Sequence, residues 1–301
     1  MTRIPIVIDT DPGVDDFFCL AIGAAYPEKL DLKAVTAMGG NHYTDVTTQN
    51  ALNILHLFGR DDVPVARGAD RYLAAEFAEP VVDHHGENGV GGLLLKQAPG
   101  KPDPLPAWEK IREMAAAYPG ELVLVTVAPL TNVGMALQMY PEIASRIKKI
   151  VMMGGTIEKG NMSPYAEANV GHNPEAAKIV FESGIPVDMV GLHLTLRCPL
   201  PRDTFDKMAV NCREEMRSAM QKLIDFRKGE PMHDSIAIAS LANEEMITWK
   251  RGTVSVITED PIHRGQTVFT ENENGNCRVS VSVDLDAYYE VIEKVLLTCT
   301  A

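Results

Sequence analysis

The sequence predicts an α/β fold with an open, mostly parallel sheet flanked by helices. Short runs of apolar, β-branched residues alternate with stretches of helical periodicity, which is the pattern of successive βαβ units. The runs are apolar almost throughout, as strands are when helices cover both faces of a parallel sheet. With 301 residues, 46% of them hydrophobic, the chain is long enough to bury one large α/β domain or two smaller ones.

The predicted strands and helices alternate along most of the chain. The expected pairs are Ile4 to Ile8 with Asp15 to Ala25, Leu32 to Thr36 with Thr44 to Phe58, and Leu122 to Val127 with Thr131 to Met139. A strand at Lys149 to Met153 then precedes a long loop, a helix at Pro174 to Ser183 and a strand at Pro186 to Val190. Three further strands, at 254–257, 267–270 and 279–283, are expected as a C-terminal elaboration of the sheet.

A segment rich in glycine and proline, residues 71–106, interrupts this pattern. Its composition predicts a long loop within the domain and does not resemble a linker between two domains. No internal repeat is visible. We therefore predict a single domain over residues 1–301.

Composition excludes several classes of partner. The 28 Lys and Arg residues against 41 Asp and Glu give a net charge of −13, which repels nucleic acid and anionic membrane surfaces. The five cysteines include no Cys-x-x-Cys pair, so reduced, mostly buried thiols are expected. Neither a signal peptide nor a run of membrane-spanning length is apparent, which predicts a cytoplasmic protein.

Four aspartates, Asp9, Asp11, Asp15 and Asp16, follow directly on the first apolar strand. They are expected at the carboxyl edge of the sheet, where open α/β proteins bind ligands. Four like charges this close repel one another unless a cation or protons neutralise them. Oxygen ligands without a nearby Cys or His favour Ca²⁺ or Mg²⁺ over zinc. The alternative is that one aspartate caps the following helix and the others are solvated.

The pattern Asp-x-Asp-Pro-Gly-x-Asp-Asp at residues 9–16 resembles the signature of the inosine–uridine-preferring nucleoside hydrolase family. Further blocks match in order: Gly39-Gly40-Asn41, Pro129-Leu130-Thr131-Asn132, Met153-Gly154-Gly155, Gly160-Asn161, Glu167-x-Asn169 and His233-Asp234. The resemblance runs from about Ile4 past Gly265. It implies a Rossmann-like nucleoside hydrolase fold and hydrolysis of the N-glycosidic bond of purine or pyrimidine ribonucleosides, giving ribose and free base.

The resemblance also implies a metal and a mechanism. In that family Ca²⁺ is held by residues that match Asp11, Asp16 and Asp234, and by a backbone carbonyl that matches Val127. Asp9 is expected behind these ligands, hydrogen-bonded to their surroundings. Asp15 matches the general base, which activates a calcium-bound water. His233, whose ordinary pKa lies near neutrality, is expected to protonate the departing base.

Side chains that could hold the sugar and base follow from the same match. Asn41, Asn161, Glu167 and Asn169 offer the donors and acceptors that a polyhydroxylated ring needs, although a single Asn in a Gly-rich loop is more often a turn residue. His85 lies in a loop, residues 84–89, that resembles the family's flexible loop over the active site. Asn88 replaces the hydroxyl residue usual there, so the preferred base stays open.

Three further residues could belong to the base pocket, and two others are interpreted as structural. Gln221, Asp225 and Phe226 precede His233 on a helical stretch and could line the base pocket. Asn173 and His193, by contrast, stand where the family often has Asp, and we interpret both as structural.

Two other functions remain open at this point. A Mg²⁺-dependent phosphohydrolase of the haloacid-dehalogenase type also begins with a strand ending in Asp-x-Asp, but that class has Thr or Val where this chain has Gly13. A nonenzymatic, calcium-stabilised nucleoside-binding protein would leave Asp15 and His233 idle. The resemblance further implies a homodimer or homotetramer that acts on a small-molecule ribonucleoside.

Overall fold

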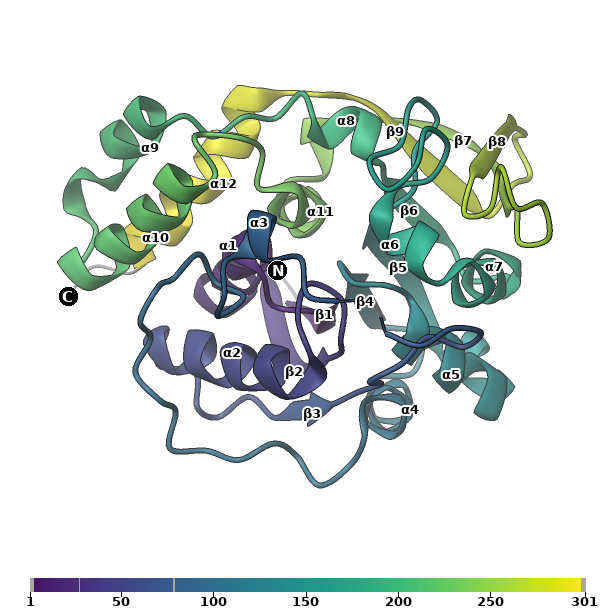
Figure 1. Ribbon diagram of the computed structural model, residues 1–301, viewed down its shortest axis with the longest axis horizontal. Helices are drawn as coiled ribbons and strands as arrows, with labels where there is room; N and C mark the ends of the chain where they lie inside the picture. The colour runs from purple at the N-terminus through teal and green to yellow at the C-terminus, as the bar shows by residue number, and fades with distance from the viewer. Residues whose placement is uncertain (1–2, 27, 78, 299–301) are drawn as a thin grey trace.

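A mixed, mostly parallel sheet of nine strands runs through the protein, whose computed structural model describes residues 3–26, 28–77 and 79–298 (Figure 1). The strand order is β3-β2-β1-β4-β5-β6-β9-β7-β8. The strands are β1 (Ile4–Thr10), β2 (Leu30–Ala37), β3 (Val65–Arg67), β4 (Leu122–Thr126), β5 (Ile147–Met153), β6 (Val187–Val190), β7 (Ile247–Val256), β8 (Thr267–Glu271) and β9 (Cys277–Val283). Only the pairs of β7 with β8 and β9 are antiparallel. The predicted fold class is confirmed.

Helices cover both faces of this sheet. They are α1 (Val14–Ala25), α2 (Thr44–Leu57), α3 (Val82–His85), α4 (Ala107–Ala117), α5 (Thr131–Met139), α6 (Ala168–His172), α7 (Pro174–Glu182), α8 (Leu192–Thr195), α9 (Arg202–Met208), α10 (Glu214–Phe226), α11 (His233–Ala242) and α12 (Leu285–Thr298). Strand β1 shows how the two layers form, because Ile6 and Ile8 enter one apolar cluster and Val7 enters the other.

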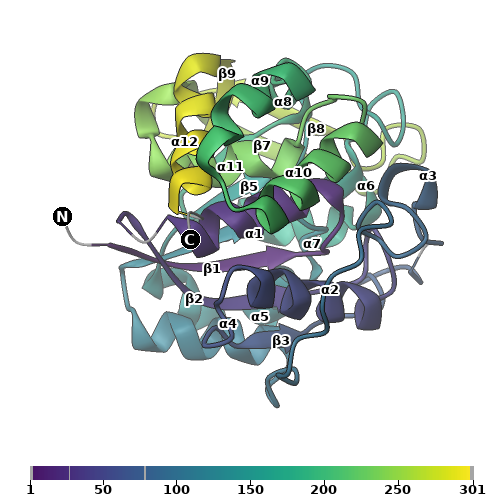
Figure 2. The same cartoon turned by 90° about the vertical axis from the view of Figure 1, so that its left-hand side faces the viewer.

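The first cluster packs β1 against α1, α2, α10, α11 and α12, and Figure 2 shows α1, α10, α11 and α12 together on one side of β1. The second cluster packs the opposite face against α4, α5 and α7. Helix α11 lies directly against α1. Residues of α1 and α11, far apart in the sequence, therefore pack against each other next to β1.

Some elements differ from the sequence prediction. Strand β7 begins at Ile247, earlier than the predicted 254–257, and β9 pairs in parallel with β6, so the C-terminal strands continue the same sheet. The predicted loop at 71–106 contains, among its described residues, only the short helix α3. Four cysteines are free and buried, namely Cys19, Cys198, Cys212 and Cys277, whereas Cys299 lies outside the described residues. No described helix combines the length and apolar character needed to cross a membrane.

A buried ion-pair cluster joins β5, β6 and β9 away from the aspartates of β1. The Asp188 carboxylate accepts hydrogen bonds from Arg278 Nε and Nη2, at 2.6 and 2.7 Å, and from Lys149 Nζ at 3.0 Å. Burial acts to raise the pKa of Asp188, but the hydrogen bonds and charges of Arg278 and Lys149 outweigh it, and the pKa lies below its ordinary value.

Replacing Asp188 with Asn should therefore lower the free energy of unfolding at pH 7 by about 2–3 kcal/mol, since two cations lose their partner. A lowered pKa in the folded state gives stability that is present above the unfolded pKa, about 3.9 for Asp, and is lost as the pH falls through the folded value. Urea unfolding at several pH values should show the two proteins converging below about pH 4.

The matched control is Asp62, which accepts a similar pair of hydrogen bonds from Arg60 on the surface. Asp62→Asn should lower the free energy of unfolding by less than about 1 kcal/mol at any pH. An equal loss in the two variants would contradict a special role for the buried cluster.

Candidate active site

Five buried aspartates gather above the carboxyl end of β1. Asp9 lies near the end of β1 and Asp11 directly follows it, Asp15 and Asp16 lie in the first turn of α1, and Asp234 lies in the first turn of α11. Carboxylate oxygens of Asp15, Asp16 and Asp234 lie within 4.8 Å of one another. The packing of α11 on α1 thus brings together acidic groups that are far apart in the sequence.

Short hydrogen bonds fix Asp11 and Asp16. The Thr10 hydroxyl and the Gly13 backbone N–H, at 2.9 Å, donate to the Asp16 carboxylate. Asn41 links the two acids, because its backbone N–H donates to Asp11 Oδ2 at 2.7 Å and its side-chain amide donates to Asp16 Oδ2 at 3.0 Å. Asp11 Oδ1, in contrast, is buried without a hydrogen-bond partner. An oxygen of this kind suits a cation.

The electrostatics of the cluster agree with that interpretation. Burial raises the pKa of Asp11 well above its ordinary value, and the charge of Asp16 adds to the effect. Burial also raises the pKa of Asp234, again with repulsion from Asp15 and Asp16. A divalent cation would offset both causes, because its charge favours the ionised carboxylates. The donors are all oxygen atoms, which fits a hard cation such as Ca²⁺ or Mg²⁺.

Asp9 is bound to neighbouring elements of the fold. Its Oδ1 accepts hydrogen bonds from the Thr36 hydroxyl at 2.6 Å and from the Asn132 amide at 2.8 Å. Burial raises its pKa to about 6, although these two hydrogen bonds act to lower it. Its position fits a group that orients the loops around the acidic cluster without touching a ligand.

The acidic cluster needs a glycine at position 40. A Cβ atom on Gly40 would lie 1.9 Å from Asp11 Oδ2, the oxygen that Asn41 holds. We expect Gly40→Ala to displace the Asp11 carboxylate, and so to weaken any stabilisation that added Ca²⁺ or Mg²⁺ gives in thermal unfolding. Gly100→Ala is the matched control, because a Cβ at Gly100 meets nothing within 4 Å. A Gly40 variant that is stabilised by these ions as strongly as the control would contradict the expectation.

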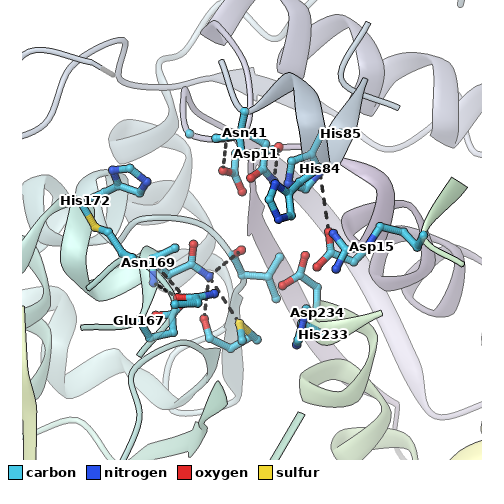
Figure 3. A pocket seen from close by; sticks show the side chains of 18 residues that line it. Asp11, Asp15, Asn41, His84, His85, Glu167, Asn169, His172, His233 and Asp234 are labelled. Atoms are coloured by element: carbon cyan, nitrogen blue, oxygen red, sulfur yellow. Dashed lines mark hydrogen bonds and ion pairs between the residues drawn. The ribbon is translucent and has the colours of Figure 1, made fainter. Parts of the chain in front are cut away.

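A second group of polar residues faces the aspartates across a cavity of about 270 Å³ (Figure 3). Glu167 begins helix α6 and accepts hydrogen bonds from the backbone N–H groups of Gly155, at 2.7 Å, and Asn169, at 2.9 Å. The Asn169 amide donates to the Val127 carbonyl at 3.1 Å. Asn161 accepts a hydrogen bond from the Ala168 backbone N–H at 3.0 Å.

Each of these side chains is therefore oriented by backbone. Burial raises the pKa of Glu167 to about 7, despite the backbone N–H groups that act to lower it. The Val127 carbonyl keeps a second lone pair beyond the one that Asn169 uses. The predicted residues Asn161, Glu167, Asn169 and Val127 all line the cavity with Asp11.

Histidines and an arginine lie near Asp15. The Val14 N–H donates to His85 Nδ1 at 3.2 Å, and this nitrogen lies 3.9 Å from Asp15 Oδ1, an oxygen that has no hydrogen-bond partner. His233 Nδ1 and the Thr195 hydroxyl are 2.7 Å apart.

These neighbours set the charge of Asp15. Burial acts to raise the pKa of Asp15. Cationic neighbours, of which His85, Arg227 and His233 act most strongly, outweigh burial and hold that pKa below its ordinary value. Burial lowers the pKa of His85 to about 4 and also lowers that of His233. Arginine, in contrast, keeps its charge at every working pH. Arg227 thus supplies the permanent positive charge beside Asp15.

Several residues lie outside the cavity. Gln221 donates to Asp206 and Asp225 pairs with Arg202, so neither side chain lines it. Asn173 caps α7, and His193 Nε2 contacts the Ser280 carbonyl at 2.7 Å, which agrees with structural roles.

Sequence reasoning missed Arg227, Met162 and His172, which all line the cavity. For Arg227 the one available signal was its place in the turn just before His233.

The chain is similar to known proteins along almost its whole length. Residues 6–290 match the family described as inosine-uridine preferring nucleoside hydrolase. The chain is 36% identical over 301 residues to a non-specific ribonucleoside hydrolase, RihC, of Salmonella newport, with 96% of each chain covered.

Solved structures give the same result. A plant nucleoside hydrolase, the PpNRh1 enzyme, has a TM-score of 0.91 at 27% identity, with 100% of both chains covered. A purine-preferring ribonucleoside hydrolase from Gardnerella vaginalis has a TM-score of 0.91 at 29% identity, covering 98% of this chain and 99% of that one. The chain therefore belongs to the inosine-uridine preferring nucleoside hydrolase family and is a hydrolase that acts on N-glycosyl bonds.

Proposed function

We propose that the chain is a single nucleoside hydrolase domain that converts purine or pyrimidine ribonucleosides to ribose and free base, with Asp15 as general base and His233 as leaving-group acid. The observation that carries this proposal is that Asp11 and Asp15 each present a buried, unpartnered carboxylate oxygen at one cavity. The family match over residues 6–290 argues against the phosphohydrolase alternative.

Ca²⁺ is the proposed cofactor. Asp11, Asp16 and Asp234 and the carbonyl of Val127 would hold it, with Asp9 supporting them from behind. When bound, the ion supplies positive charge that attracts ribose hydroxyls and lowers the pKa of nearby water. Asp15 also belongs to the acidic triad with Asp16 and Asp234, so its role as base needs a test of its own.

The residues that would take part in the reaction lie on two walls of the cavity. Asn161, Glu167 and Asn169 would bind the sugar hydroxyls on one wall, with Asn41 above them, while His85 approaches the base. Asp15 accepts a proton from water, and the water oxygen bonds to the anomeric carbon. The bond from that carbon to the base nitrogen breaks, and its electron pair leaves with the base. The imidazolium form of His233, which burial disfavours but the charge of Asp15 favours, then gives its proton to the base.

Incubation of the purified chain with inosine, uridine, cytidine and adenosine tests this proposal. Release of ribose and free base from at least one of them is expected. Phosphate release from nucleotides with no action on nucleosides would favour the phosphohydrolase, and tight binding without turnover would favour a nonenzymatic binding protein. A homodimer or homotetramer remains a prediction that sedimentation can test.

A further inference from the structure

Arg227 is a buried cation at the wall of the proposed substrate cavity. Its side chain is only 9% exposed, and it lines the cavity together with Asp15, His85 and His233. Nη2 lies 3.3 Å from the exposed Glu230 carboxylate, whereas Nε is buried and has no hydrogen-bond partner among the described residues. A buried donor left without a partner is costly, which suggests that an acceptor reaches it in the working enzyme.

The backbone around Arg227 is firmly placed. Helix α10 ends at this residue, and the chain turns through Lys228 and Gly229, both of which have positive φ. The Gly229 N–H donates to the Ile224 carbonyl at 3.0 Å, which closes the end of the helix. The guanidinium is thus attached to a rigid turn that leads directly into α11 and His233.

Charge distinguishes Arg227 from every other residue of the cavity. Among the described residues that line it, Arg227 alone carries a fixed positive charge. Its charge acts on Asp15, His85 and His233 and lowers the pKa of each. Figure 3 shows Asp15 and His233 across the cavity from Glu167 and Asn169. Because the charge of Arg227 acts on Asp15 and His233, Arg227 acts from their side of the cavity.

We infer that Arg227 is a catalytic residue that binds the departing nucleobase and stabilises the negative charge that develops on it, with a preference for bases that present a carbonyl oxygen or an unprotonated ring nitrogen. This inference rests on the proposed function. As the glycosidic bond breaks, its electron pair moves into the base, and the guanidinium N–H groups donate to the base atoms that receive the charge. Arg227 transfers no proton. It acts beside the leaving-group acid and does not replace it.

A comparison of two leaving groups tests this inference. A nucleobase is a poor leaving group that needs help, whereas the nitrophenolate of 4-nitrophenyl riboside departs without protonation. We expect Arg227→Met to lower kcat on inosine and uridine by roughly 10²–10³-fold. The fold-loss of kcat on nitrophenyl riboside should be smaller than this by a factor of at least about ten. Arg227→Lys, which keeps the charge but not the planar fork, should give an intermediate loss on the nucleosides.

Arg202→Gln is the matched control, because Arg202 pairs with Asp206 and Asp225 outside the cavity, and its kinetics should match wild type. Equal losses on both substrates, or full activity of the Arg227 variants on nucleosides, would overturn the inference. If thermal unfolding shows that Arg227→Met does not fold, Arg227→Lys is used in its place. The loss of kcat on nucleosides is then compared with the loss of kcat on nitrophenyl riboside in that variant. Wild-type protein that hydrolyses neither substrate would instead refute the proposed function.

Discussion

Asp15→Asn is expected to lower kcat for ribonucleoside hydrolysis by about 10²–10⁴-fold, the usual contribution of a positioned general base. Asp15 lines the cavity and is 7% exposed, and none of the described residues donates a hydrogen bond to its Oδ1, so this oxygen keeps its lone pairs for a proton. Asparagine has the same shape but accepts protons far more weakly. Steady-state kinetics on inosine and uridine at saturating Ca²⁺ measure the loss.

The same variant distinguishes a base from a metal ligand. If Asp15 is the base, Asp15→Asn keeps the stabilisation by Ca²⁺ while it loses turnover, whereas the loss of both would assign Asp15 to the ion. Asp286→Asn is the control, since Asp286 also lies in the first turn of a helix, α12, but is exposed. A variant at position 15 that keeps more than about a tenth of wild-type kcat would contradict the proposed role.

Removal of Ca²⁺ is expected to abolish turnover and to destabilise the fold. Without a cation, burial and mutual repulsion raise the pKa of Asp11, Asp16 and Asp234, in the case of Asp16 to about 6. Ca²⁺ at 100 times its Kd would add about 2.7 kcal/mol of stability, which corresponds to a rise in Tm of roughly 5 °C. Thermal unfolding after chelation, followed by titration with Ca²⁺, measures this shift.

Asp234→Asn should abolish the Ca²⁺-dependent rise in Tm, because Asp234 is the member of the cluster that comes from α11. Asp286→Asn again serves as control and should keep the full rise. An unchanged Tm and undiminished turnover in excess chelator would exclude a calcium enzyme. If Mg²⁺ but not Ca²⁺ restores turnover and Tm, the same site binds Mg²⁺ in place of Ca²⁺.

Sequence reasoning predicted the central sheet well because its strands are unusual. Strands β1 and β4 are buried on both faces, so nearly every residue is apolar and the runs stand out from their surroundings. Strand β7 is different, since buried and exposed residues alternate along much of its length and it contains Lys250, Arg251 and Gly252. Its first half therefore gave no apolar run, and its start was predicted too late.

The site residues also differ in how well the sequence predicts that they lie together. The first four aspartates follow one strand, so sequence alone indicated that they share an edge of the sheet. Nothing local placed Asp234 beside them, because that contact depends on α11 packing against α1. It was inferred only through the resemblance to a family. Arg227 was missed because burial and an unpartnered Nε are properties of the folded chain, and an arginine at a helix end is ordinary in sequence.

The packing of α11 on α1 also has a consequence for biosynthesis. During translation the four aspartates of residues 9–16 are made before the helices and strands from α2 to α10, and Asp234 follows only after all of them. A nascent chain that has not reached α11 therefore holds these four carboxylates without the fifth. The proposed cation site is complete only once α11 has been made and has packed against α1.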